Sequence, residues 1–235
     1  MGIQGVRDGF YLAIDTSTET AGLALLRPDG VLQSELSWRA GRNHTAQLYP
    51  ALDYLLRQAK TTSQGLSGLV VALGPGSFTG LRVGVAAAKG LALALQVPLV
   101  GVGTLEAAAY PFAWSTLPIW SLVDAGRTEV AAACFQTRRG AVRKVRAEAV
   151  MSPEALCAAV PSGRRALFCG EVPPAVEALL RERLGKRAVF PAGPHRMRRA
   201  GYLARLGWER LQRGDADDLT TLAPLYSRRP AVLDR

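Results

Sequence analysis

Residues 69–95 constrain the fold of this chain more than any other stretch. Residues 69–73 form a continuous apolar run, which is the pattern of a strand covered on both faces. A Gly-Pro-Gly turn at 74–76 interrupts the run, and the hydroxyl of Ser77 can then accept from the first free amides of a helix starting at residue 78. The stretch therefore predicts a buried strand, a tight turn and a capped helix.

The helix predicted over residues 78–95 is apolar on nearly all sides, because Arg82 and Lys89 are its only charged residues. A helix covered on one side only would show a polar face, so this one must be covered twice. Its small residues allow a second backbone to come close. They form two stripes, one of Gly80, Gly84, Ala87 and Leu91 and the other of Val83, Ala86, Gly90 and Ala94. One stripe is expected against the chain's own sheet and the other against a neighbouring helix or another chain.

A glycine turn at a helix N-terminus can also bind phosphate, because amides converge there at the positive end of the helix dipole. Gly76 and Ser77 are the candidates for such a site. The pattern lacks the Gly-Lys-Ser/Thr ending of a Walker loop, since Leu81 and Arg82 follow Gly80. We therefore favour the simpler interpretation that these glycines serve a tight turn and close helix packing.

The remaining elements of the first half follow a β-β-β-α-β-α-β order. Three strands are predicted over 10–17, 20–27 and 31–38, joined by turn residues. A helix over 43–59 precedes the central strand and helix, and the apolar run 99–103 is the last strand. Three antiparallel strands that continue into a βαβ unit are typical of the actin, Hsp70 and sugar-kinase (ASKHA) superfold, whose two lobes hold ATP between them.

The second half repeats this order. Its strands are predicted over 119–123, 129–136, 142–150, 166–170 and 187–190. Ser152 and Pro153 are expected to open a short helix, and a second helix is predicted over 174–184. A final helix is expected over 194–213 with Tyr202, Leu206 and Leu211 toward the core. We therefore predict an α/β protein of duplicated lobes, the first over residues 1–105 and the second, basic lobe over residues 106–235.

Composition excludes several classes of protein. With 49% apolar residues the chain can bury a full core. Residues 1–11 contain Arg7 and Asp8 and lack the apolar core of a signal peptide, and no uncharged run is long enough for a membrane span, so we expect a cytoplasmic protein that does not bind membranes. The three widely spaced cysteines favour buried, reduced thiols over a disulfide framework or a zinc site.

The net charge of +10 lies entirely in the second half. Residues 1–135 hold nine basic and nine acidic side chains, whereas the last 100 residues hold twenty and ten. This excess is either a nucleic-acid footprint or the solvated surface of an arginine-rich protein. For the first alternative, the candidate tRNA contacts are Arg196, Arg198 and Arg199.

Candidate catalytic residues are few. In the ASKHA superfold an Asp of the first hairpin usually handles the metal of a bound nucleotide, and Asp15 and Thr16 occupy that place here. Asp124 sits in the equivalent hairpin of the second half. All of these are equally consistent with turn residues that bond their own backbone. The two histidines, His44 and His195, are too far apart in sequence for a His-x-x-x-His metal site, and no Gly-x-Ser-x-Gly elbow is present, so no metal or hydrolase site is predicted.

Five motifs together resemble the TsaB (YeaZ) family. They are Leu-Ala-Ile-Asp-Thr-Ser-Thr-Glu at 12–19, His44-Thr45, Gly-Pro-Gly-Ser-Phe-Thr-Gly-Leu-Arg-Val-Gly at 74–84, Gly-Val-Gly-Thr-Leu at 101–105 and Asp124-Ala125. The Gly-Pro-Gly-Ser-Phe-Thr-Gly block is the most specific of them. The resemblance extends to a Pro-x-Tyr-x-Arg signature at 224–228 and is diffuse over 138–213.

The resemblance implies a bacterial protein needed for threonylcarbamoylation (t6A) of the adenosine beside the tRNA anticodon. It implies a non-catalytic partner that docks on and activates the catalytic relative TsaD together with the ATPase TsaE, and that meets tRNA through the complex. TsaD carries a metal-binding His-x-x-x-His helix after the strand that matches 99–103, where this chain has Thr104 and Ala108. Neither side chain is a useful metal ligand.

The resemblance also implies an interface on the first two helices of the first lobe, which the chain shares with TsaD or, when alone, with a second copy of itself. The residues expected there are His44, Leu48, Leu52, Leu55, Arg82, Val83, Ala86, Gly90 and Ala94. No cofactor is assigned to this chain itself, and ATP or ADP is left open at an interface of the complex. The alternative is an autonomous ATPase or kinase of the same superfold, against which the missing glycine after Asp15 argues.

Overall fold

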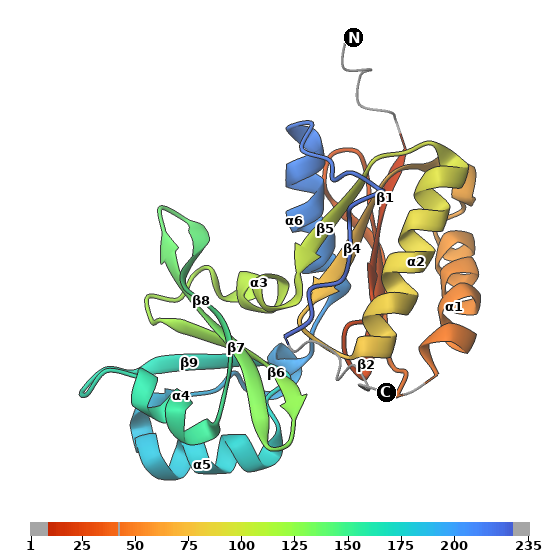
Figure 1. Ribbon diagram of the computed structural model, residues 1–235. Coiled ribbons are helices and arrows are strands. Elements are labelled where there is room, and N and C mark those ends of the chain that lie inside the picture. The colour runs from red at the N-terminus through yellow and green to blue at the C-terminus, as the bar shows by residue number, and fades with distance from the viewer. Residues whose placement is uncertain (1–8, 42, 228–235) are drawn as a thin grey trace. The chain divides into compact units, whose positions relative to one another are not determined.

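The computed structural model describes residues 9–41 and 43–227, which divide into two compact units. The first unit comprises the chain up to residue 104 together with 199–225, and the second is built from 105–198. Each unit contains one five-stranded mixed sheet (Figure 1). Arg228 of the C-terminal signature lies outside the described residues.

The first sheet has the order β3-β2-β1-β4-β5. Its antiparallel meander pairs β1 with β2 and β2 with β3, and β1, β4 and β5 run parallel. The strands are β1 (Phe10–Asp15), β2 (Thr20–Leu26), β3 (Leu32–Arg39), β4 (Leu66–Gly74) and β5 (Leu99–Gly103). β1 is the middle strand, and β4 lies between β1 and β5. As predicted, β4 is buried along nearly its whole length, because helices cover both faces of the sheet.

Helices α1 (His44–Gln58) and α2 (Phe78–Leu95) cover one face of this sheet (Figure 1). Both contribute to the largest apolar cluster of the unit, which joins Leu48, Leu52, Leu55 and Leu56 of α1 to Val85, Ala88 and Ala92 of α2 and to the strands beneath. The bounds predicted for α2 are confirmed at both ends. Ser77 caps it, because the Ser77 hydroxyl accepts from the Gly80 amide at 3.2 Å.

The other face of the first sheet is covered by α6 (Ala200–Gln212), which packs on β1, β2 and β4. The division predicted at residue 105 is therefore wrong for the C-terminal segment, which completes the first unit. The predicted face of α6 is confirmed for Leu211, which lies against Gly68 of β4, but not for Tyr202 and Leu206, which are only half-buried. Its buried residues are Ala200, Leu203, Ala204 and Gly207. Small residues face the sheet because the helix lies close to it: a side chain at Gly207 would meet Val70 at 2.3 Å.

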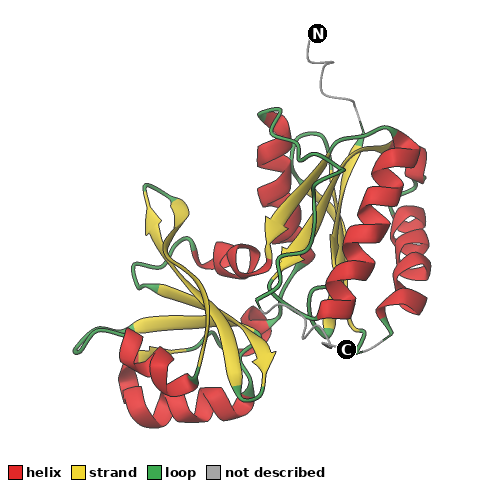
Figure 2. Ribbon diagram, viewed as in Figure 1, coloured by secondary structure: helices red, strands yellow, loops and turns green. Residues whose placement is uncertain are grey.

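The second sheet repeats the topology of the first. Its order β10-β9-β6-β7-β8 is the same pattern of meander followed by parallel strands, which confirms the predicted duplication. The strands are β6 (Ile119–Gly126), β7 (Glu129–Arg138), β8 (Ala141–Met151), β9 (Ala166–Gly170) and β10 (Ala188–Val189). Helices α4 (Pro153–Ala159) and α5 (Pro174–Leu184) pack against each other beside this sheet and bury their apolar sides in one cluster with it (Figure 2).

Helix α3 (Thr104–Ala109) and the 3-10 turn Tyr110–Phe112 follow β5 of the first sheet but pack on the second one. Leu105, Ala109 and Phe112 form a cluster there with Ile119 and Phe135. Helix α6 shows the reverse arrangement, because it follows β10 of the second sheet but packs on the first sheet. Each of these two helices therefore packs on the sheet of the other unit, and not on the sheet of the strand that precedes it.

The predicted helix over 194–213 begins later than expected. A 3-10 turn (Gly193–Arg196) is followed by extended backbone at Met197 and Arg199 before α6 begins at Ala200. The break falls where the chain passes from one unit to the other, between Arg198 and Arg199. The helical spacing of apolar residues does not indicate where a chain passes from one unit to the next, so the sequence alone did not predict this break.

Candidate functional site

The glycine turn before α2 is shaped by the β1–β2 loop that lies against it. A side chain at Gly76 would stand 1.9 Å from the Ser17 carbonyl oxygen, and one at Gly80 would stand 2.1 Å from the Thr16 carbonyl oxygen. The Ser77 amide donates to the Ser17 carbonyl at 2.7 Å. This geometry supports the packing interpretation of these glycines, because the chain's own backbone occupies the space that their missing side chains leave.

Asp15 and Thr16 are buried in the same loop. The Asp15 carboxylate accepts from the Ser17 amide at 3.0 Å and from the Ser17 hydroxyl at 2.6 Å, and the Thr16 hydroxyl donates to the Gly80 carbonyl at 2.7 Å. Asp124 forms the corresponding turn in the second unit, where its carboxylate accepts from the Gly126 amide at 2.8 Å. The two aspartates therefore make equivalent turn contacts in the duplicated hairpins.

The outer side of α2 is a continuous exposed surface. Arg82, Ala86, Gly90, Leu93 and Ala94 are exposed, and Val83 is half-buried. We call these six residues the α2 face. A side chain at Gly90 would meet nothing within 4 Å, and Leu93 is 57% exposed. The predicted second stripe of α2 thus lies at the surface of its own unit, whereas Gly80, Gly84 and Ala87 are buried.

The predicted interface residues of α1 are not at the surface. Leu48, Leu52 and Leu55 belong to the core of the first unit, and His44 is 4% exposed with its Nε2 atom 2.8 Å from the Thr18 carbonyl oxygen. The interface prediction is therefore wrong for these four residues. The apolar stripe of α1 instead packs on β2 and β3 and beside α2. The exposed aromatic residues of α1 are Tyr49 and Tyr54.

Helix α2 is also the one helix of the described residues that is long and apolar enough to cross a membrane, with a mean hydropathy of 1.4. It packs on β4 and contributes its buried side to the core of the first unit. Its composition is accounted for by this place against the sheet, since sheet-covering helices of α/β proteins pass the same length and hydropathy criteria.

Thr104 and Ala108, the positions matched to the metal ligands of TsaD, lie one turn apart on α3 and are buried. Within the part of the chain that the structure describes, the Thr104 hydroxyl has no hydrogen-bond partner. Neither residue supplies a nitrogen, thiolate or carboxylate ligand, so these positions do not fit a transition metal. No cluster of three or more His, Cys, Asp or Glu side chains suited to a metal occurs in residues 9–41 and 43–227.

The three cysteines are free, as predicted. Burial raises the pKa of Cys134 to about 11 and that of Cys169 to about 12. Both thiols therefore stay protonated at neutral pH, which disfavours a nucleophilic role. Cys157 is only half-buried, and burial also raises the pKa of its thiol.

The three arginines proposed to contact tRNA are ion-paired within the chain. Arg196 donates to both carboxylate oxygens of Glu177, at 2.8 and 2.9 Å. Arg198 is buried and lies 3.8 Å from Glu171. Arg199 donates to Glu35 at 2.8 Å, while the second Glu35 oxygen accepts from the Gly201 amide at the start of α6. These pairs fix the chain where it passes between the units. The sequence analysis missed Glu35 and Glu177, which lie far from the arginines in sequence.

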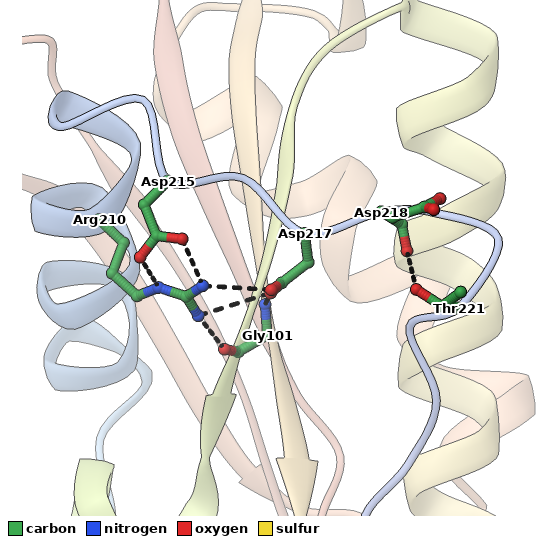
Figure 3. Close-up of polar contacts among 6 residues, drawn as sticks. All are labelled: Gly101, Arg210, Asp215, Asp217, Asp218 and Thr221. Atoms are coloured by element: carbon green, nitrogen blue, oxygen red, sulfur yellow. Dashed lines mark hydrogen bonds and ion pairs between the residues drawn. The ribbon is translucent and has the colours of Figure 1, made fainter.

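A C-terminal strap, residues 215–225, runs beside β5 and α2 (Figure 3). Arg210 of α6 donates to both oxygens of Asp215, to Asp217 and to the Gly101 carbonyl, and Asp217 accepts from the Gly101 amide at 2.7 Å. The strap ends with the Leu225 amide on the Leu73 carbonyl. The strap also pairs with the edge strand β5, because the Asp217 amide donates to the Leu99 carbonyl at 2.9 Å and the Asp217 carboxylate accepts from the Gly101 amide. These groups would otherwise be unpaired on the open edge of the sheet.

Comparison with known proteins decides the family. A family model described as TsaD, tRNA N6-adenosine threonylcarbamoyltransferase, matches residues 38–178. The chain is 34% identical over 218 residues to the tRNA threonylcarbamoyladenosine biosynthesis protein TsaB of Bacillus subtilis, covering 92% of this chain and 93% of that protein. The chain belongs to the TsaB family.

Solved structures agree with this family. YeaZ from Pseudomonas aeruginosa superimposes with a TM-score of 0.76 at 27% identity, over 93% of this chain and 99% of that one. The (R)-2-hydroxyglutaryl-CoA dehydratase component A of Acidaminococcus fermentans superimposes with a TM-score of 0.52 at 11% identity, over 87% of this chain and 99% of that one. The second likeness shows the fold alone. The predicted family and the duplicated α/β fold are confirmed.

Proposed function

We propose that this chain is a non-catalytic subunit of the bacterial machinery that makes t6A in tRNA, and that it docks on the catalytic relative TsaD and activates it together with the ATPase TsaE. The proposal places the chain in the cytoplasm and brings it to tRNA through the complex. Its main structural support is the α2 face, defined above by six residues. Family membership supplies the reaction in which the docking takes part.

Gly90 is the clearest sign that the α2 face meets another molecule. A glycine in an exposed helix interior costs about 1 kcal/mol relative to alanine. Nothing in the first unit requires this one, because the position opens onto empty space. Gly90 and its neighbours Ala86 and Ala94 leave room for a partner helix to approach closely, and Leu93 offers an apolar side chain to bury beside them.

A non-catalytic role is supported by α3. Thr104 and Ala108 replace the residues that hold the metal in TsaD, and both are enclosed in the fold. The chain therefore lacks the ligands for that metal at the matching positions. We propose that the reacting atoms are handled entirely by the partner.

In the absence of TsaD, the same face is expected to pair with a second copy of the chain. A surface of small and apolar residues on one straight helix can be self-complementary about a two-fold axis. The proposal leaves ATP or ADP to an interface of the complex, and gives Asp15, Thr16, Gly76, Ser77 and Asp124 the turn and capping roles described above.

Size-exclusion chromatography with light scattering tests the docking directly. The wild-type chain, mixed with its cognate TsaD, is expected to elute as a one-to-one complex. Gly90→Glu and Ala86→Glu are expected to abolish this complex, because each places a charge in the middle of the α2 face. Gly90→Glu is the sharper variant, since it also improves helix propensity and leaves the fold intact.

Ala175→Glu is the matched control, because Ala175 is an exposed alanine on helix α5 of the second unit. It should leave the complex unchanged. Complexes that survive both α2 substitutions would refute this docking surface. A chain that forms no complex and hydrolyses ATP alone would instead support an autonomous ATPase.

A further inference from the structure

The second unit carries a cavity that no part of the proposed docking uses. Its volume is about 670 Å³, and it lies at the β10 edge of the second sheet. The lining residues come from the loop before β9 and from the segment that leads into and through β10. They are Arg165, Lys186, Arg187, Ala188, Val189 and Phe190.

The charge of this cavity is one-sided. Three of its six lining residues are basic and none is acidic. Among the described residues, Arg165 and Lys186 have no carboxylate partner, and Arg187 makes one backbone contact, from its Nη1 atom to the Pro161 carbonyl at 3.3 Å. Arg164, next to Arg165, adds a further exposed cation.

The two arginines next to the cavity differ from those that line it, because they are paired with a carboxylate. Arg181 and Arg196 both pair with Glu177, which lowers the pKa of that carboxyl, and both stack near the ring of Phe190. The Phe190 ring in turn stacks on Phe168 of β9, with 5.5 Å between ring centroids. The wall of the cavity is thus anchored to the core. The arginines paired with Glu177 lie against Phe190, whereas the cations without a carboxylate partner line the cavity itself.

We propose that this cavity binds the phosphates of an RNA backbone. Guanidinium groups match phosphate oxygens in geometry, and converging cations without a carboxylate suit a uniform polyanion. Residues 105–198 hold fourteen basic and eight acidic side chains, so the whole unit attracts such a ligand. An acidic protein surface is the weaker alternative, because the aromatic side chain that lines the cavity, Phe190, is half-buried and already stacks on Phe168.

The choice of RNA over other polyanions rests on the proposed function. The basic character of the cavity is observed in the structure and does not depend on that function. It also replaces the prediction that Arg196, Arg198 and Arg199 make the tRNA contacts, since those side chains hold the fold together. The cations of the cavity are free to exchange water and counterions for phosphate.

Fluorescence anisotropy with a labelled tRNA transcript and the full chain tests the proposal. The triple variant Arg165→Gln, Lys186→Gln, Arg187→Gln is expected to bind tRNA about tenfold more weakly, and the slope of log Kd against log salt should fall by about 2–3, roughly one for each lost phosphate contact. The double variant that keeps Arg187 guards against loss of its contact to Pro161, and should show most of the effect.

The control is Arg138→Gln, Arg139→Gln, Arg143→Gln, which removes the same charge from the β7–β8 hairpin of the same unit. It is expected to change tRNA affinity less than threefold. Equal losses in both triple variants would show a mere net-charge effect and overturn the proposal, as would unchanged binding in the cavity variant. Loss of binding to an acidic peptide or to anionic vesicles, with tRNA binding intact, would overturn it too. Complex formation with TsaD, measured on the same samples, should not change, so failure here is distinguishable from failure of the proposed function.

Discussion

At the scale of single residues, the glycines of α2 divide into two kinds that the sequence does not distinguish. Gly80 and Gly84 lie against the loop that contains Thr16, within 2.1–2.3 Å of where a side chain would begin. Gly90 faces open space. Glycine therefore allows close packing within the chain at the start of α2, whereas at Gly90 it leaves the surface of the helix open.

Alanine substitutions at Gly80 and Gly90 should therefore act in opposite directions. Gly80→Ala is expected to destabilise the chain by about 2–3 kcal/mol, because the backbone carbonyl it would strike cannot move away cheaply. Gly90→Ala should stabilise it by about 1 kcal/mol through helix propensity. Urea unfolding curves of the two variants measure both effects. A stabilised Gly80→Ala protein would show that the loop yields, contrary to this account.

The cap of α2 gives a second prediction at this scale. Ser77→Ala is expected to cost about 1 kcal/mol, because the Gly80 amide loses its acceptor at the start of the helix. Ser77→Asp should restore most of the stability, since its carboxylate can accept the same bond next to the positive helix end. Thermal unfolding of the two variants against wild type is the measurement, and equal losses in both would argue against a capping role.

At the scale of elements, the strap is held to β5 by carboxylates. Hydrogen bonds and charge from Arg210 lower the pKa of Asp215, and hydrogen bonds from Thr220 lower that of Asp218. Because these pKa values are lower in the folded chain, the stabilisation is fully present above the ordinary value of 3.8 and is lost as the pH falls through the folded values. Acid is thus expected to weaken the pairing of Asp215 with Arg210 of α6 and the turn that Asp218 forms with Thr220, while both stay intact at neutral pH.

Amide exchange measured by NMR checks this arrangement. Arg210→Gln should reduce the protection of the Asp217 and Leu225 amides by about tenfold at neutral pH, and the protection should then change little on acidification. Amides of α1 provide the internal control and should keep their protection. Strap amides that are as protected in the variant as in wild type would show that the apolar contacts of Leu219 and Leu222 suffice.

Most elements were predictable because their signals are local. The bounds of α2, β5, β9 and α5 follow from apolar runs bounded by turn residues and caps. The side of a helix that is buried depends on distant partners, which explains why Tyr202 and Leu206 were placed on the buried side of α6 and why Leu48, Leu52 and Leu55 were assigned to an interface. The cavity at β10 could not be predicted for the same reason, because Arg165 and Lys186 are brought together only by the pairing of β9 with β10.

At the scale of the whole molecule, the first unit is discontinuous in sequence. Removing α6 would expose the face of the first sheet that carries Tyr11 and Val70. A fragment of residues 1–104 is therefore expected not to fold cooperatively, whereas residues 105–198 should fold alone around their own two clusters. Circular dichroism and NMR spectra of the fragments check this, and addition of a peptide of residues 199–225 should restore the first unit. A well-folded 1–104 fragment would contradict the division described here.

The central claim is that this chain activates a partner and does not itself catalyse the transfer. The most direct measurement is t6A formation in a tRNA transcript supplied with threonylcarbamoyl-adenylate, using this chain alone, TsaD with TsaE, and all three proteins together. We expect no product from the chain alone, a strong increase when it is added to TsaD and TsaE, and loss of that increase with Gly90→Glu but not with Ala175→Glu. Product formed by the chain alone, or full activation by Gly90→Glu, would contradict the central claim.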